Sequence, residues 1–106
     1  MTRGDVHEIT LSRRRGHVQR GRRYAVVVQA DDLLALSTVV VCPTSTSTPP
    51  ASFHPEIVLA GEAARVMCAM VGAVDGRALG EPFGHIGLNE MLAVDNALEL
   101  VLDIGS

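Results

Sequence analysis

Short runs of β-branched and apolar residues recur along this chain, and they constrain its fold more than any other feature. Valine-rich runs predict largely buried strands at Tyr24–Gln29 and Ser37–Cys42, because β-branched side chains suit a packed, pleated surface. Further strands are predicted over residues 5–11, 55–60 and 65–71. So many short strands in 106 residues must curl or close to hide their edges.

Turn-forming residues separate these runs. Residues 12–23 form a polar loop in which Gly16 and Gly21 are hinge points. Pro43 lacks a backbone donor and is expected to end the third strand, so that residues 43–52 form a loop rich in Ser, Thr and Pro. A turn around Gly61-Glu62 separates the next two strands. One or two helical turns are predicted at 31–36, and short strands at 73–74 and 83–86 flank a loop over 76–84.

The last part of the chain predicts one clear helix. Gly87 can serve as its N-cap, and Glu90 lies three residues on, as in a capping box. Apolar residues then recur at steps of three and four, which predicts one buried face: Met91, Leu92, Val94, Leu98, Val101 and Leu102. The segment Asp103–Gly105 ends the helix. The predicted fold is mainly β with a C-terminal α-helix: a small β-barrel or strongly bent sheet in a single domain spanning residues 1–106.

Charge is distributed unevenly along the sequence. The net charge is -3, yet residues 1–24 hold seven of the nine basic groups and only two acids, Asp5 and Glu8. Every basic residue is arginine, whose fork can contact phosphate or carboxylate through two hydrogen bonds. A genome rich in G and C would also favour arginine, but the local density favours an anionic partner.

Several classes of protein are disfavoured by what the sequence lacks. No apolar stretch approaches the ~18 residues of a membrane helix, and the N-terminus lacks the apolar segment of a signal peptide, so a cytoplasmic protein is expected. Cys42 and Cys68 each lie in an apolar run and are expected to be reduced core thiols rather than a disulfide. His54 and His85 have no Cys or His at metal-ligand spacing, so neither a metal nor another cofactor is expected.

Five segments, taken in order, resemble the MazF/PemK/Kid toxins of bacterial toxin–antitoxin systems. They are RGDV followed by GHVQRGRRYAVVVQ (16–29), VVVCPTSTS (39–47), AVDGRALG (73–80) and EMLAVDNALELVL (90–102). The resemblance implies an SH3-like β-barrel that works as a homodimer. It also implies a metal-independent endoribonuclease that cuts single-stranded RNA by attack of the RNA 2′-hydroxyl, leaving a cyclic phosphate and a free 5′-hydroxyl. An antitoxin with an acidic segment would hold it in check.

The same resemblance suggests particular site residues. Arg23, immediately before the strand, matches the catalytic arginine of the family, and Thr44 matches its active-site threonine. His17 matches a histidine found in some members, and flanking arginines would keep it neutral as a base. RNA-contact candidates follow from their positions beside these residues: Gln19, Arg20, Arg22, Ser45 and Thr46.

Three departures from the family pattern leave a second interpretation open. Val18 replaces a common glutamate, and Tyr24 replaces the proline that usually follows the arginine. The fifth strand usually carries an acid, a glutamine and an arginine, but here the segment Met67–Gly72 is apolar throughout. The alternative is therefore a catalytically weakened or inactive relative that binds RNA or an antitoxin without cleaving.

Overall fold

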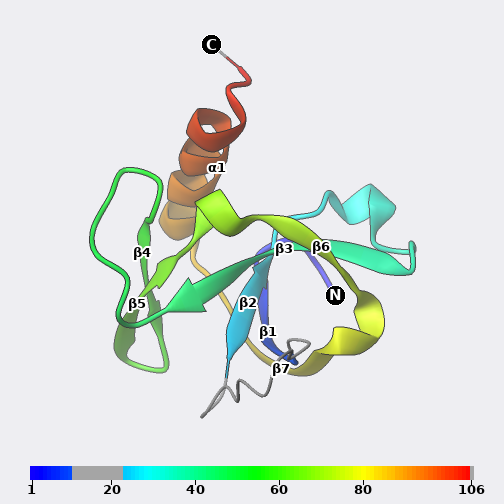
Figure 1. The fold of residues 1–106 in the computed structure, drawn as a ribbon. Helices are drawn as coiled ribbons and strands as arrows, with labels where there is room; N and C mark the ends of the chain where they lie inside the picture. The colour runs from blue at the N-terminus through cyan, green and yellow to red at the C-terminus, as the bar shows by residue number, and fades with distance from the viewer. Residues whose placement is uncertain (11–22, 106) are drawn as a thin grey trace, which may run out of the picture.

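Antiparallel strands and one long helix make up the computed structural model, which describes residues 1–10 and 23–105 (Figure 1). Three single-turn 3-10 helices connect some of them. The elements in chain order are β1 (Asp5–Ile9), β2 (Tyr24–Val27), η1 (Asp31–Leu33), β3 (Thr38–Ser45), β4 (Glu56–Leu59), β5 (Glu62–Val66), η2 (Cys68–Met70), β6 (Gly72–Asp75), η3 (Gly76–Ala78), β7 (Leu79–His85) and α1 (Leu88–Leu102).

Strand β3 is the centre of the sheet. One of its edges pairs with β2, with Val26 opposite Cys42. Its other edge is shared: the first half, Thr38–Val41, pairs with β6, and the second half, Thr44 and Ser45, pairs with β5. The sheet therefore divides at β3, with the β4–β5 hairpin on one branch and β6 on the other.

The sheet curls strongly because its outer strands are consecutive in the chain. β6 and β7 lie at opposite ends of the order β6-β3-β2-β1-β7, yet only the short turn η3 joins them (Figure 1). Curling hides strand edges that would otherwise be open to pairing. The predicted mainly-β barrel with a C-terminal helix is thus confirmed. β7 is longer than the predicted strand at 83–86, because its pairing with β1 continues as far as Leu79.

Alternation along the strands fills two separate apolar clusters. Val26 and Val28 of the first valine run point toward α1, where they pack with Val94 and Leu98. Ala25 and Val27 of the same run point to the opposite face of the sheet. They form the second cluster with Ile9, Val39 and Val41. Both faces of these strands are buried, as the valine runs predicted.

Helix α1 begins directly after Gly87, as predicted from the capping box that Gly87 forms with Glu90. Glu90 makes two contacts at this end of the helix. Its carboxylate accepts a hydrogen bond from the Gly87 amide at 2.8 Å and, with the other oxygen, from the Val58 amide of β4 at 2.8 Å. One side chain thus caps the helix and ties it to the sheet. The buried face is narrower than predicted, because Leu92 and Leu102 are about half exposed.

The prediction that Pro43 ends the third strand is wrong. β3 continues through it to Ser45. Pro43 lies where β3 has left β6 and not yet begun its paired stretch with β5, and its carbonyl accepts from the Met67 amide at 2.8 Å. A proline is tolerated at such a break in a strand ladder because little donor capacity is lost.

The predicted fifth strand, 65–71, is displaced toward the N-terminus. β5 is Glu62–Val66, and Cys68–Met70 form the turn η2 instead. The hairpin before it turns at Ala60-Gly61, both with positive φ, as a type I′ two-residue turn requires. Glu62, expected in the turn, is therefore the first residue of a strand.

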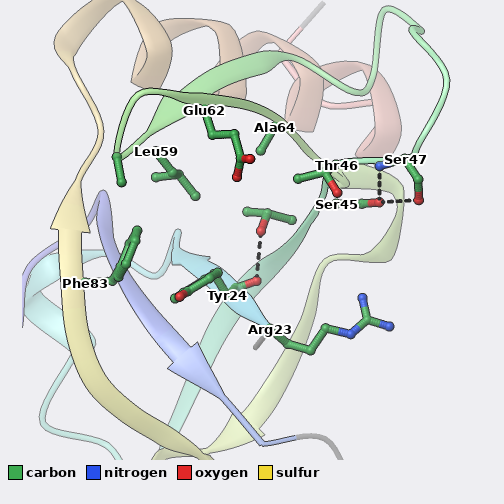
Figure 2. A pocket seen from close by; sticks show the side chains of 11 residues that line it. Arg23, Tyr24, Ser45, Thr46, Ser47, Leu59, Glu62, Ala64 and Phe83 are labelled. Carbon is green, nitrogen blue, oxygen red and sulfur yellow. Dashed lines mark hydrogen bonds between the residues drawn. The ribbon is translucent and has the colours of Figure 1, made fainter. Parts of the chain in front are cut away.

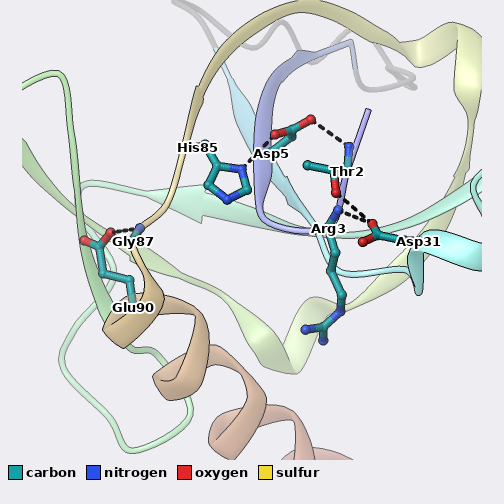
Figure 3. Close-up of polar contacts among 7 residues, drawn as sticks. All are labelled: Thr2, Arg3, Asp5, Asp31, His85, Gly87 and Glu90. Atoms are coloured by element: carbon teal, nitrogen blue, oxygen red, sulfur yellow. Dashed lines mark hydrogen bonds and ion pairs between the residues drawn. The ribbon is translucent and has the colours of Figure 1, made fainter.

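Polar contacts join the N-terminal residues to η1 and α1, and Figure 3 shows those with Asp31. Asp31 accepts from the Arg3 amide at 2.6 Å and from the Thr2 hydroxyl at 3.0 Å, and Arg3 forms an ion pair with Asp95 of α1 at 2.8 Å. Gly4 adopts φ +97°, and a Cβ there would lie 3.0 Å from the His85 ring, so a larger residue would be strained and would have to displace that ring.

Both cysteines lie in the core as free thiols with no exposed surface. They are neighbours in space: Cys42 comes from β3 and Cys68 from η2. The hydrogen bond between the two thiols and their burial raise the pKa of Cys42, so this thiol stays protonated.

Candidate functional site

A pocket of about 440 Å³ opens between the β4–β5 hairpin and the ends of β2, β3 and β7 (Figure 2). Its wall combines one cation, one carboxylate, four hydroxyl side chains from consecutive residues, and two aromatic rings. These are contributed by Arg23, Glu62, Thr44, Ser45, Thr46, Ser47, Tyr24 and Phe83. Its volume lies within the range of ~300–1,000 Å³ usual for ligand sites.

Arg23 lies at the rim of this pocket, half-buried, directly before β2. Its carbonyl accepts from the Ile9 amide at 2.9 Å, which fixes the backbone at the end of the β1–β2 pair. The side chain extends along the edge below Ser45 (Figure 2). A rigid strand thus holds a guanidinium beside a row of hydroxyl groups, an arrangement suited to an anion.

Thr44 lies in strand β3 and not in a loop. Thr44 is only 7% exposed, and its hydroxyl donates to the Tyr24 carbonyl at 3.2 Å. Because that bond uses the single hydroxyl proton, the oxygen is left as a hydrogen-bond acceptor toward the pocket. A threonine hydroxyl could donate a hydrogen bond to phosphate or accept one from a hydroxyl of the RNA. Accepting fits this geometry better, because the hydroxyl proton is already used.

Ser45 and Thr46 also lie on the pocket wall, as does Ser47. The Ser47 amide donates to the Ser45 hydroxyl oxygen at 3.1 Å, and the two hydroxyls are 3.3 Å apart. This local turn at the end of β3 presents the hydroxyls together on one side (Figure 2). The structure therefore brings Arg23, Thr44, Ser45 and Thr46 to one pocket. His17, Gln19, Arg20 and Arg22 lie outside the described residues.

Sequence reasoning missed three members of this pocket. Tyr24 and Phe83 are far apart in the chain, yet their ring centroids are 4.3 Å apart with an interplanar angle of 37°. Glu62 projects its carboxylate into the pocket from the opposite wall (Figure 2). In the sequence, Tyr24 is a departure from the family pattern and, with Phe83, one of only three Tyr or Phe residues, and Glu62 is expected in a turn. None of these three positions can be assigned to a common pocket until the pairing of the strands is known.

The segment Met67–Gly72 does not line this pocket. Part of it borders a separate apolar groove of about 260 Å³ on the other side of Arg23, lined by Ile9, Arg23, Val41, Pro43, Met67, Met70, Gly72, Ala73 and Val74. Within residues 1–10 and 23–105, no three His, Cys, Asp or Glu side chains gather where they could hold a metal ion. In the same part of the chain, no helix is long and apolar enough to cross a membrane.

A small curled antiparallel sheet with a C-terminal helix is the architecture of solved MazF toxins. The sequence matches the family of PemK-like, MazF-like toxins of type II toxin–antitoxin systems over residues 2–102. The chain belongs to this family, and it is a toxin of a MazF-type toxin–antitoxin system.

Individual relatives agree with this assignment. A Mycobacterium tuberculosis protein named "Putative toxin Rv3098A" is 35% identical over 104 residues, covering 96% of this chain and 97% of that one. A mycobacterial endoribonuclease, solved in complex with its cognate antitoxin, has a TM-score of 0.84 at 17% identity and covers 100% and 98% of the two chains. MazF from Deinococcus radiodurans has a TM-score of 0.80 at 19% identity, covering 98% and 97%. At these identities the solved structures establish the fold.

Proposed function

We propose that this toxin is a metal-independent endoribonuclease that cuts single-stranded RNA by attack of the RNA 2′-hydroxyl. The observation that carries the proposal is the meeting of Arg23 and Thr44, with the hydroxyls of Ser45 and Thr46, at one pocket. The family assignment and the structural likeness to a mycobacterial endoribonuclease support it.

The proposed reaction needs a proton acceptor, charge stabilisation and a correctly placed nucleophile. The 2′-oxygen loses its proton to the base and bonds to phosphorus while the bond to the 5′-oxygen breaks; the leaving 5′-oxygen takes up a proton from water, giving a 2′,3′-cyclic phosphate and a free 5′-hydroxyl. Arg23 stabilises the charge that grows on the phosphorus oxygens. Thr44, with its own proton donated to the Tyr24 carbonyl, is the hydrogen-bond acceptor that orients the 2′-hydroxyl in the bound RNA before the base takes its proton. His17 is proposed as the base that removes the 2′-hydroxyl proton.

The arginine-rich segment would serve binding. Seven of the nine arginines precede Tyr24, and we assign Gln19, Arg20 and Arg22 to contacts with the RNA backbone. An antitoxin with an acidic segment would compete for the same cations. We further propose that the toxin acts as a homodimer.

A second candidate function is RNA or antitoxin binding without cleavage. The observation that favours it is the segment Met67–Gly72, where the resemblance implies an acid, a glutamine and an arginine: the segment is apolar, includes η2 and lines no part of the pocket. Cleavage by this chain would then have to rest on Arg23, Thr44 and His17, with Glu62 of β5 as the carboxylate at the pocket.

Mapping RNA cuts separates the two functions. The purified protein is incubated with a mixed RNA in EDTA, and new 5′ ends are located by primer extension. Discrete cuts are expected, slowed at least ~100-fold by Arg23→Ala because a cation at the reacting phosphate is lost, and ~10-fold by Thr44→Val.

The matched controls are Arg77→Ala and Thr38→Val. Arg77 is an exposed arginine paired with Asp75, and Thr38 is an exposed threonine of β3, so neither variant should change the cutting rate. Salt-sensitive RNA binding without cuts over hours would overturn the nuclease and favour the binding module.

A further inference from the structure

An aromatic pair forms one wall of the pocket. Tyr24 begins β2 and Phe83 lies in β7, the two strands that flank β1, and the curl of the sheet brings the rings together. Tyr24 is half-buried and Phe83 is 39% exposed, so part of the ring surface faces the pocket. Only three residues of the chain are Tyr or Phe, and two of them meet here. A partly exposed pair of rings at a pocket wall is a platform for a flat, unsaturated ligand.

A carboxylate faces this platform across the pocket. Glu62 is exposed at the start of β5, and its side chain points inward between Leu59 and Ala64 (Figure 2). Leu59 and Ala64 give the wall beside it an apolar surface. An ionised carboxylate only accepts hydrogen bonds, so the ligand edge that it contacts must carry N–H or O–H donors.

The remaining wall is suited to phosphate. Arg23 and the hydroxyls of Ser45 and Thr46 lie on the side of the pocket away from Phe83 (Figure 2). Rings, carboxylate and cation therefore divide the pocket into an aromatic part and an anion-binding part. A nucleotide has the same division, with a flat base at one end and a phosphate at the other.

We propose that the pocket holds one nucleobase of the RNA, stacked on Tyr24 and Phe83, and that Glu62 selects guanine. This inference rests on the proposed action on single-stranded RNA and deepens it. Guanine presents two adjacent N–H donors on its Watson–Crick edge, and both carboxylate oxygens can accept from them. Adenine and cytosine offer a donor beside an acceptor. Uracil offers one N–H between two carbonyl oxygens, which would face the carboxylate unfavourably.

Binding is measured separately from cleavage. The probes are fluorescent octamers in which every 2′-hydroxyl is 2′-O-methylated, so that they cannot be cut: all-uridine, and the same octamer with one central G, A or C. Anisotropy titrations at fixed salt give the dissociation constants. The unaltered protein is expected to bind the G octamer at least ~10-fold more tightly than the all-uridine octamer, a ratio typical of a good two-pronged base contact.

Each wall has its own variant. Glu62→Gln is expected to bring the G and uridine octamers within about twofold of each other, while Glu81→Gln, an exposed glutamate of β7, preserves the preference. Phe83→Leu is expected to weaken binding of all four octamers ~5- to 150-fold, the fold-change that corresponds to ~1–3 kcal/mol of stacking. Phe53→Leu, an aromatic of similar exposure outside the pocket, is the matched control, and Phe83→Tyr, which keeps a ring, should bind normally.

Four outcomes decide the inference. A loss of the guanine preference in Glu62→Gln, with the fold intact by circular dichroism, supports it. Equal binding of all octamers by the unaltered protein overturns it, even if RNA is cut. A Glu62→Gln variant that cuts slowly but still prefers guanine also overturns it, because Glu62 would then act on the reaction. Guanine-selective binding without any cleavage overturns only the proposed nuclease.

Discussion

Asp31 illustrates how single carboxylates hold the N-terminal segment in place. It accepts from the Arg3 amide and the Thr2 hydroxyl, and these bonds lower the pKa of its carboxyl group. Asp5 is similar: burial opposes its ionisation, but hydrogen bonds from His85 and the Thr2 amide outweigh burial and lower its pKa. In their ionised form, both carboxylates therefore stabilise the folded state.

This predicts an acid-sensitive fold. Because the folded pKa of Asp31 lies below the unfolded value of ~3.9, its contribution is present above that pH and is lost as the pH falls through the folded pKa. The free energy of unfolding, measured by urea titration, is expected to fall from pH 4 downward, and to fall less steeply in Asp31→Asn. Asp32→Asn, at the adjacent exposed position, is the control. Identical pH profiles for Asp31→Asn and the unaltered protein would contradict the assignment.

Among the elements, α1 and the β4–β5 hairpin depend on one side chain. Glu90 accepts from the Gly87 amide at the helix start and from the Val58 amide of β4, both at 2.8 Å. A helix end without such a partner leaves amides unsatisfied. The same contact fixes the hairpin that carries Glu62 into the pocket, so the helix cap and the candidate site are connected through β4 and β5.

Removing this contact should weaken both elements. Glu90→Ala is expected to lower the free energy of unfolding by ~1–2 kcal/mol, because two backbone amides lose a charged acceptor. Glu90→Gln keeps one carbonyl oxygen and should lose about half as much. Chemical denaturation monitored by circular dichroism measures the difference. Asn89→Ala, at the adjacent exposed position, should keep the free energy of unfolding within ~0.5 kcal/mol of the unaltered protein. An unchanged free energy of unfolding in Glu90→Ala would refute the double role of Glu90 in capping α1 and binding β4.

At the scale of the whole molecule, the apolar groove beside Arg23 remains uncovered within the described chain. Met70 is 58% exposed at its rim, and Pro43, Met67 and Val74 line it. Because exposed apolar surface of this kind is unfavourable in water, it marks a place for contact with another protein surface. The proposed homodimer gives it a partner in a second copy of the chain.

Light scattering tests this arrangement. The unaltered protein at micromolar concentration is expected to have twice the 11.2 kDa mass of the chain, whereas Met70→Arg should have the mass of one chain, because a guanidinium would have to be desolvated in the contact. Leu88→Arg changes a more exposed apolar residue on α1, 77% exposed, and should stay dimeric. A dimer that survives Met70→Arg would place the contact elsewhere, and a monomeric unaltered protein would refute the homodimer.

Periodicity and local chemistry determined much of this fold in advance. The valine runs predicted strands buried on both faces, Glu90 predicted the helix start, and the number of short strands predicted a curled sheet. These features depend on neighbours within a few residues, which a sequence displays directly. The errors fell where a distant partner decides the outcome. Pro43 remains in β3 because Met67 and the division of the sheet accommodate it, and β5 begins at Glu62 because Ala60 and Gly61 form the turn.

The candidate site divides in the same way. The sequence alone determined the arginine-rich segment, the hydroxyl-rich run after the third strand, and the resemblance that linked Arg23 to Thr44. Only the tertiary structure decided that Thr44 is buried with its proton given to the Tyr24 carbonyl, and that Phe83 and Glu62 join it at the pocket. The physical reason is the antiparallel pairing of β2 with β3 and of β1 with β7, which brings together residues far apart in the sequence, such as Tyr24 and Phe83, 59 positions apart.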